Sequence, residues 1–181
     1  MKTEDIIDLI VRGEPGADKR VLEHASDAAA RARVIRALIA LLDRWPSSEI
    51  RHDAFIDAIA ALGKLNAEEA IPALLRVLLL QPGAAAAEPI REIVYTPPAV
   101  EALIGIGERS VPETLAYLRQ SDPENAAIPV AVQRVVAGVL GERAGRELIE
   151  REIRISADPA ERSRLEECLE YFGIEAGADR Q

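Results

Sequence analysis

The sequence predicts an all-α protein, a short α-solenoid (an α-α superhelix) built from antiparallel helix pairs. Hydrophobic residues make up 49% of the chain and aromatic residues only 3%, so alanine and leucine, both strong helix formers, supply most of the core. β-Branched and aromatic residues form no alternating run typical of a strand. Helix start and stop signals recur along the chain, and the segments that they bound repeat with a period near 40 residues.

Residues 1–46 are expected to form N-terminal capping helices. Thr3 can cap a first short helix. A longer helical stretch then runs from about residue 18 to residue 45, and Ser26-Asp27 offers a point where it divides in two. Pro46 stops this stretch, because proline cannot continue a helix without losing a hydrogen bond.

A first helix pair is expected over residues 47–80. The serines at 47–48 open a helix that stops at Gly63. Asn66 is followed three residues later by Glu69, which is the spacing of a capping box. The second helix of the pair should therefore start directly after Asn66.

A second pair is expected over residues 99–120. Its first helix stops at Gly107. Ser110 and Glu113 have the spacing of a second capping box and should open the second helix.

The third pair is expected over residues 123–155, and a C-terminal capping helix over residues 158–173. Asp122-Pro123-Glu124 has a cap residue followed by a proline at the first helical position. That helix should end near Gly141, and the next should run from Glu142 to Ile155. Asp158-Pro159 repeats the cap-and-proline pattern at the start of the last helix.

The pairs share a local motif. Ala61-Leu62-Gly63 is followed by Ala70-Ile71-Pro72, and Ala102-Leu103-Ile104-Gly105-Ile106-Gly107 is followed by Ser110-Val111-Pro112. The two prolines lie 40 residues apart. The third unit, with Val139-Leu140-Gly141, lacks the proline.

The segment from Ala58 to Leu78 resembles bacterial HEAT-like repeats of the phycobilin-lyase type, and the resemblance covers about residues 51–155. It implies a stack of helix pairs in which each pair buries its apolar face against its neighbours. It says little about function, because the fold hosts scaffolds, adaptors and a few enzymes.

In such stacks the second helix of each pair lines the concave surface. Its leucines, Leu74, Leu75, Leu78, Leu115 and Leu118, should be core. Residues one helical step away should face outward and contact a partner, and these candidates are Arg76, Val77, Glu113, Tyr117, Glu147 and Arg151.

Residues 81–98 interrupt the pattern with an insert that contains four prolines. Connections between stacked helices usually have about 2–8 residues, so this insert is long. Long loops on a rigid scaffold often carry recognition, and Arg91 and Tyr95 are its candidate contact residues. The alternative is a tolerated surface insertion, because added loop length costs little free energy.

The charge balance argues against a nucleic-acid partner. The formal net charge is −9 and the pI about 4.9, whereas a protein that binds a phosphate backbone needs a basic face. The predicted concave face mixes both signs of charge, which suits a protein or peptide. We therefore expect a protein partner.

No group of residues predicts catalysis, a cofactor or a metal site. His24 and His52, the two histidines, are expected on the surface rather than as metal ligands. Cys168 lies near Leu165 and Leu169 on an amphipathic helix, which favours a buried small hydrophobic residue over a nucleophile.

The sequence predicts a cytoplasmic protein without a membrane segment. No apolar run reaches the roughly 18 residues that a transmembrane helix needs, and the first residues show no signal-peptide pattern. One cysteine also excludes an intrachain disulfide.

Three functional hypotheses follow. The first is a non-enzymatic scaffold or adaptor that binds a partner on its concave face or on the 81–98 insert. The second, suggested by the family resemblance alone, is a small-ligand-binding or lyase-like helper. The third is a structural subunit that self-associates through its end helices, with candidate contacts at Ile6, Ile7, Leu9, Ile10, Leu165, Leu169 and Phe172.

Overall fold

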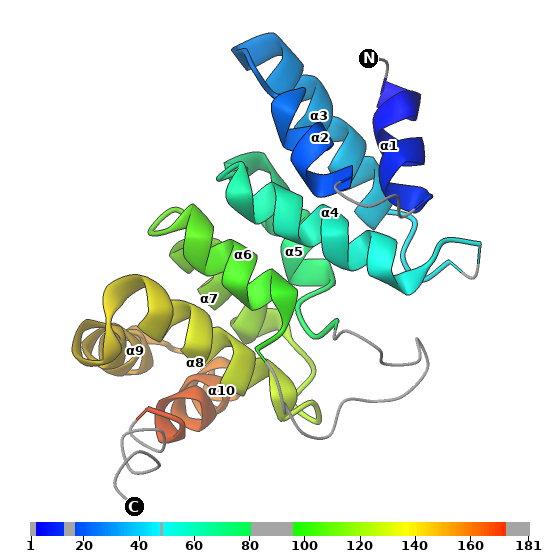
Figure 1. The fold of residues 1–181 in the computed structure, drawn as a ribbon. Helices are drawn as coiled ribbons and strands as arrows, with labels where there is room; N and C mark the ends of the chain where they lie inside the picture. The colour runs from blue at the N-terminus through cyan, green and yellow to red at the C-terminus, as the bar shows by residue number, and fades with distance from the viewer. Residues whose placement is uncertain (1–2, 13–16, 48, 81–95, 173–181) are drawn as a thin grey trace, which may run out of the picture.

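The computed structural model describes residues 3–12, 17–47, 49–80 and 96–172, and these residues form helices and turns with no strand (Figure 1). The predicted all-α class is confirmed. In chain order the elements are α1 (Thr3–Val11), α2 (Ala17–Glu23), α3 (Ala28–Leu42), α4 (His52–Lys64), the 3₁₀ helix η1 (Glu68–Ala70), α5 (Ile71–Arg76), α6 (Pro98–Ile106), α7 (Ser110–Gln120), α8 (Ala127–Leu140), α9 (Glu142–Ile155) and α10 (Pro159–Glu170).

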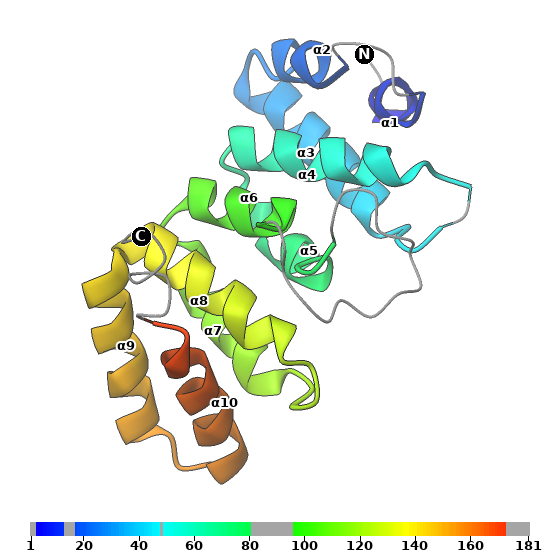
Figure 2. The ribbon, with the colours of Figure 1, turned by 60° about the horizontal axis from the view of Figure 1, so that its bottom comes forward.

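The helices are arranged in two rows. Helices α4, α6 and α8 lie side by side in sequence order, and α5, α7 and α10 lie along the other row (Figures 1 and 2). At one end α3 packs against α1 and α4, and at the other end α9 packs against α8 and α10. Helices that are near in sequence are therefore near in space along the whole molecule.

A continuous apolar core runs between the rows, from Ile10 to Phe172. The five leucines predicted as core in the second helices are all buried. Val77 was predicted to face outward, and this is wrong because only 4% of it is exposed. The helix α5 ends at Arg76, so the chain turns at Val77 and its side chain enters the core.

Helices α4 and α6 make a close contact between their backbones. Gly63 lies inside α4 rather than at its end, and α4 continues to Lys64. A Cβ atom added to Gly63 would lie 2.8 Å from the Cα atom of Ala102 in α6. Because two backbones cannot come this close with a larger residue between them, Gly63 is required by packing and not by a turn.

Asn66 ends α4 and does not cap the next helix, so the predicted capping box with Glu69 is wrong. Asn66 has a φ of 46°, in the left-handed region that asparagine tolerates better than most residues. Its N–H donates to the Gly63 carbonyl at 2.9 Å, and the Ala67 N–H donates to the Leu62 carbonyl at 3.2 Å. This pair of hydrogen bonds is a Schellman motif.

The turn after α4 is also bonded to its neighbours on both sides. With its side-chain amide oriented so that the nitrogen faces the neighbouring acceptors, Asn66 donates to the Gly105 carbonyl of α6 at 2.9 Å. From α3, the Arg31 guanidinium donates to the Leu65 and Asn66 carbonyls at 2.7 and 3.0 Å. The bond from Arg31 gives the Leu65 carbonyl, at the end of α4, a donor from a neighbouring helix.

Ser110 likewise does not cap α7, so the second predicted capping box is wrong. It is the first residue of α7, it is fully buried, and its hydroxyl lies 2.9 Å from the Leu103 carbonyl and 2.8 Å from the Gly107 carbonyl. The hydroxyl therefore donates back to the end of α6 instead of accepting from α7. Gly107, with a φ of 84°, makes this tight reversal possible.

Two predicted helix starts are also wrong. Helix α4 begins at His52, not at the serines. The residues before it pack into the core: Ile50 is buried. The Trp45 ring lies edge-on to the rings of His52 and Phe55, at centroid distances of 5.3 and 4.9 Å. Helix α8 begins at Ala127 instead of residue 123.

The residues before α8 bond within their own turn. The Asp122 carboxylate accepts from the Glu124 N–H at 2.9 Å, and the Asn125 side chain accepts from the Ala127 N–H at 3.2 Å. Such Asx turns compete with helix formation and move the helix start toward the C-terminus.

Other local predictions are confirmed. The long helical stretch divides at Ser26-Asp27, between α2 and α3, where Asp27 also accepts from the Ala30 N–H at 2.8 Å. Asp158 caps α10 by accepting from the Ala160 N–H at 2.8 Å. Helix α9 has the predicted bounds. Of the insert, Pro97 and Pro98 form the start of α6, and residues 81–95 lie outside the described residues.

The α4–α6 contact gives a first prediction. Gly63→Ala should lower the free energy of unfolding by about 1–3 kcal/mol, because the new methyl group forces two backbones apart. Gly105→Ala is the matched control, since its added Cβ would lie 3.6 Å from the Gly63 oxygen, an ordinary contact. Gly105→Ala should not lower the free energy of unfolding and should raise it by up to about 1 kcal/mol, because alanine has a higher helix propensity than glycine. Urea unfolding followed by circular dichroism measures both; equal effects of the two substitutions would contradict the packing argument.

Candidate functional site

The structure places the sequence-predicted contact residues that it describes on α5, α7 and α9. Arg76, at the end of α5, is exposed and forms an ion pair with Asp43 after α3. On α7, Glu113 is exposed, whereas Tyr117 is half-buried and packs against the core. Burial raises the pKa of the Tyr117 hydroxyl above its usual value.

Glu147 and Arg151 are exposed on α9, and Glu147 bonds to Arg143 one turn earlier at 3.2 Å. The prediction placed α9 in one row with α5 and α7, but α10 packs beside α7 and α9 packs mainly against α8 and α10. Arg91 and Tyr95 lie outside the described residues.

The displacement of α9 leaves a pocket of about 520 Å³ where α7, α9 and α10 meet. Its walls come from the end of α7, the end of α9, the connection after it and the first turn of α10. The lining residues are Ala116, Arg119, Gln120, Glu152, Ile155, Ser156, Ala157 and Glu161.

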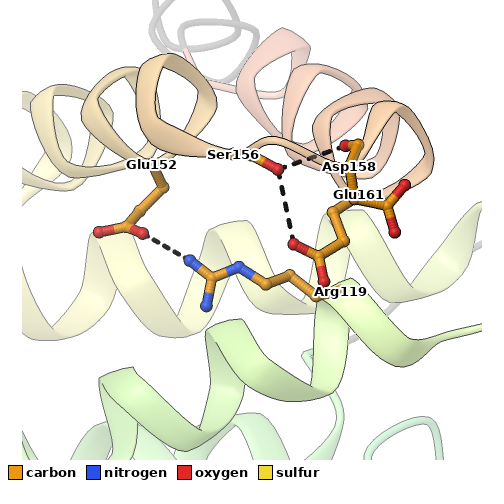
Figure 3. Close-up of polar contacts among 5 residues, drawn as sticks. All are labelled: Arg119, Glu152, Ser156, Asp158 and Glu161. Atoms are coloured by element: carbon orange, nitrogen blue, oxygen red, sulfur yellow. Dashed lines mark hydrogen bonds and ion pairs between the residues drawn. The ribbon is translucent and has the colours of Figure 1, made fainter.

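An ion pair between α7 and α9 forms one wall of the pocket. Arg119 Nη2 lies 2.5 Å from Glu152 Oε2 (Figure 3), and the two side chains are 27% and 16% exposed. At such partial burial the charges are screened less by salt than on an open surface. Arg164 of α10 donates to the Arg119 carbonyl at 2.8 Å, so the C-terminal end of α7 is also tied to α10.

The opposite wall carries Glu161, placed there by the start of α10. Asp158 caps this helix and Pro159 occupies its first position, which puts Glu161 in the first turn, where a carboxylate is favoured by the helix dipole. The Ser156 hydroxyl lies 3.5 Å from the Glu161 carboxylate and 3.3 Å from the Asp158 carbonyl. Figure 3 shows the Glu152 carboxylate directed at the Arg119 guanidinium and the Glu161 carboxylate beside the Ser156 hydroxyl.

Ile155 supplies an apolar surface beside these charges. It is the large hydrophobic side chain that stands exposed among the described residues, at 68%, and it lines the pocket. Single exposed hydrophobic residues are common, but one next to a pocket with charged walls is typical of a binding site.

Sequence reasoning missed this pocket. Ile155 lies seven residues after Leu148, a helical spacing that predicts a core position. Arg119, Glu152 and Glu161 have the appearance of ordinary charged helix surface, and only the packing of α10 beside α7 brings them together. The one local signal was the Asp158-Pro159 cap, which sets where Glu161 falls in α10.

Within the described ranges, no group of three or more His, Cys, Asp or Glu side chains is placed to hold a metal ion. His24 is exposed, and His52 is half-buried beside Trp45. No helix in the same ranges has the length and apolar character to cross a membrane. The proposed self-association residues Ile10, Leu165 and Phe172 are buried within the chain.

The chain was compared with protein-family models, with curated proteins and with solved structures, and none of the three comparisons finds a match.

The Arg119–Glu152 pair gives a second prediction. Arg119→Glu and Glu152→Arg should each lower the free energy of unfolding by about 1–2 kcal/mol, a value between those for exposed and buried ion pairs. The double variant, in which the two residues are exchanged, should regain most of the lost free energy. The exposed pair of Arg143 and Glu147, treated in the same way, should change stability by less than about 0.5 kcal/mol. A double-mutant cycle in urea measures the coupling; a coupling near zero for Arg119 and Glu152 would contradict the pairing.

Cys168 gives a third prediction. Burial and the neighbouring Glu167 carboxylate raise the pKa of its thiol to about 12, so almost no thiolate exists near neutral pH. Reaction with Ellman's reagent at pH 8 should therefore be slow in the folded protein and fast in urea. Fast reaction without denaturant would show that the thiol is accessible.

Proposed function

We propose that this protein is a non-catalytic interaction module, a short HEAT-like α-solenoid that binds a protein partner at the pocket between α7, α9 and α10. The support for the solenoid is the repeated helix pair. The turn after α4 and the turn after α6 are followed by second helices with Pro72 and Pro112 near their starts, and equivalent helices pack side by side.

The observation that carries the binding function is the combination of groups in one pocket. The exposed side chain of Ile155 has apolar surface that a bound partner can cover. The charged side chains beside it can form directional polar contacts with the same partner, and these are Arg119, Glu152 and Glu161. Interfaces commonly combine an apolar anchor with a polar rim in this way.

The rigidity of the walls supports binding over a purely structural role for the pocket. The end of α7 is bonded to α9 through Glu152 and to α10 through Arg164. The α9–α10 connection is held by Arg162, whose guanidinium donates to the Ser156 carbonyl at 2.7 Å. A pocket held in one shape loses little conformational entropy when a partner binds.

A fourth prediction tests this proposal. Peptides selected from a displayed random library against the purified full chain should bind Ile155→Ser at least tenfold more weakly than the unchanged protein, because their anchor loses its apolar contact. Arg143→Ser is the matched control, on the same helix and 93% exposed at its side chain but outside the pocket lining, and should bind normally. Fluorescence anisotropy measures the affinities.

Two outcomes would overturn the proposal. Either no peptide is enriched over repeated rounds of selection, or the enriched peptides bind Ile155→Ser as tightly as the unchanged protein. Circular dichroism spectra of both variants should match that of the unchanged chain, so that a loss of binding is not a loss of folding.

A further inference from the structure

We infer that the pocket between α7, α9 and α10 recognises a partner segment in which a basic side chain, arginine best of all, stands next to an apolar side chain. The basic group would contact Glu161 and the apolar group would cover Ile155. This inference rests on the proposed function and specifies the chemistry of the partner.

The charges on the pocket walls favour a cation. Three of the lining side chains are charged at neutral pH: Arg119, Glu152 and Glu161. Arg119 and Glu152 form a pair at 2.5 Å and neutralise each other, so one negative charge remains, on Glu161. The chain as a whole carries a net charge of −9, which adds to the attraction for a basic segment.

Glu161 also has unused hydrogen-bonding capacity. A carboxylate can accept about four hydrogen bonds. Among the described residues its side-chain partner is the Ser156 hydroxyl at 3.5 Å, and that single proton is shared with the Asp158 carbonyl at 3.3 Å. A guanidinium from a partner could donate two parallel hydrogen bonds to this carboxylate, which a lysine ammonium cannot match.

Arg162 and Arg164 of α10, both near Glu161 in sequence, point toward backbone carbonyls and not into the pocket. Arg162 donates to the Ser156 carbonyl at 2.7 Å, and Arg164 donates to the Arg119 carbonyl at 2.8 Å. Both bonds go to backbone carbonyls, and neither residue lines the pocket.

An acidic segment fits less well than a basic one. To reach Arg119, an acidic side chain would have to displace Glu152 from a short ion pair. It would then lie near two carboxylates, Glu152 and Glu161, and like charges in such proximity repel.

The apolar part of the segment follows from Ile155. Its side chain is 68% exposed, and Ala116 and Ala157 line the same pocket. Covering this surface removes apolar area from water at the edge of the charged site, which also strengthens the contact with Glu161 by lowering the local dielectric.

The test is a titration of the ¹⁵N-labelled full chain with blocked dipeptides at millimolar concentrations. Ac-Leu-Arg-NH₂ should cause saturable shifts of amide signals in residues 155–161 and at the end of α7. The isosteric but uncharged Ac-Leu-citrulline-NH₂ and the acidic Ac-Leu-Glu-NH₂ should bind at least fivefold more weakly. Glu161→Gln should remove this preference for arginine, while Glu166→Gln, an exposed position on the same helix, should retain it.

The inference is overturned if Ac-Leu-Arg-NH₂ causes no saturable shift, if the acidic probe binds equally well, or if Glu161→Gln keeps the preference. The displayed-peptide selection separates this failure from failure of the proposed function. Selected peptides that depend on Ile155 but lack a basic residue would overturn the inference and leave the interaction module standing. A selection without any Ile155-dependent peptide would overturn the interaction module itself.

Discussion

The close approach of α4 and α6 is the constraint on which the arrangement of the helices depends. Gly63 lets the two backbones meet because its side chain is a single hydrogen atom. A Cβ atom at this position would lie 2.8 Å from the Ala102 Cα. At this separation the Asn66 side chain reaches the Gly105 carbonyl at the end of α6. The angle between α4 and α6 is therefore set by backbone contact and not by flexible side chains alone.

Three helix ends are covered by neighbouring helices, and their carbonyls need hydrogen-bond donors from those neighbours. Arg31 supplies donors to the end of α4, and the Ser110 hydroxyl supplies one to the end of α6. Arg164 does the same for the end of α7, where a cation is also favoured by the helix dipole. In each case the donor comes from outside the helix that it satisfies, so helix ends and helix packing stabilise each other.

The pocket arises where this regular arrangement changes. The helix beside α7 is α10, and α9 is displaced toward α8 and α10. Ile155, the last residue of α9, is exposed there, and Glu152 is in reach of Arg119. The binding chemistry that we propose is thus a consequence of the way in which the helix stack ends.

The sequence by itself determined the all-helical class, the division at Ser26-Asp27, the bounds of α9 and the cap at Asp158, because apolar periodicity and capping act over a few residues along one helix. Only the tertiary structure decided the roles of Asn66 and Ser110, which have the spacing of cap residues but bond to carbonyls of the preceding and adjacent helices. It also decided the pocket, since Arg119, Glu152 and Glu161 come from three helices. A local pattern shows which groups can form hydrogen bonds and ion pairs, whereas packing selects the partners that they meet.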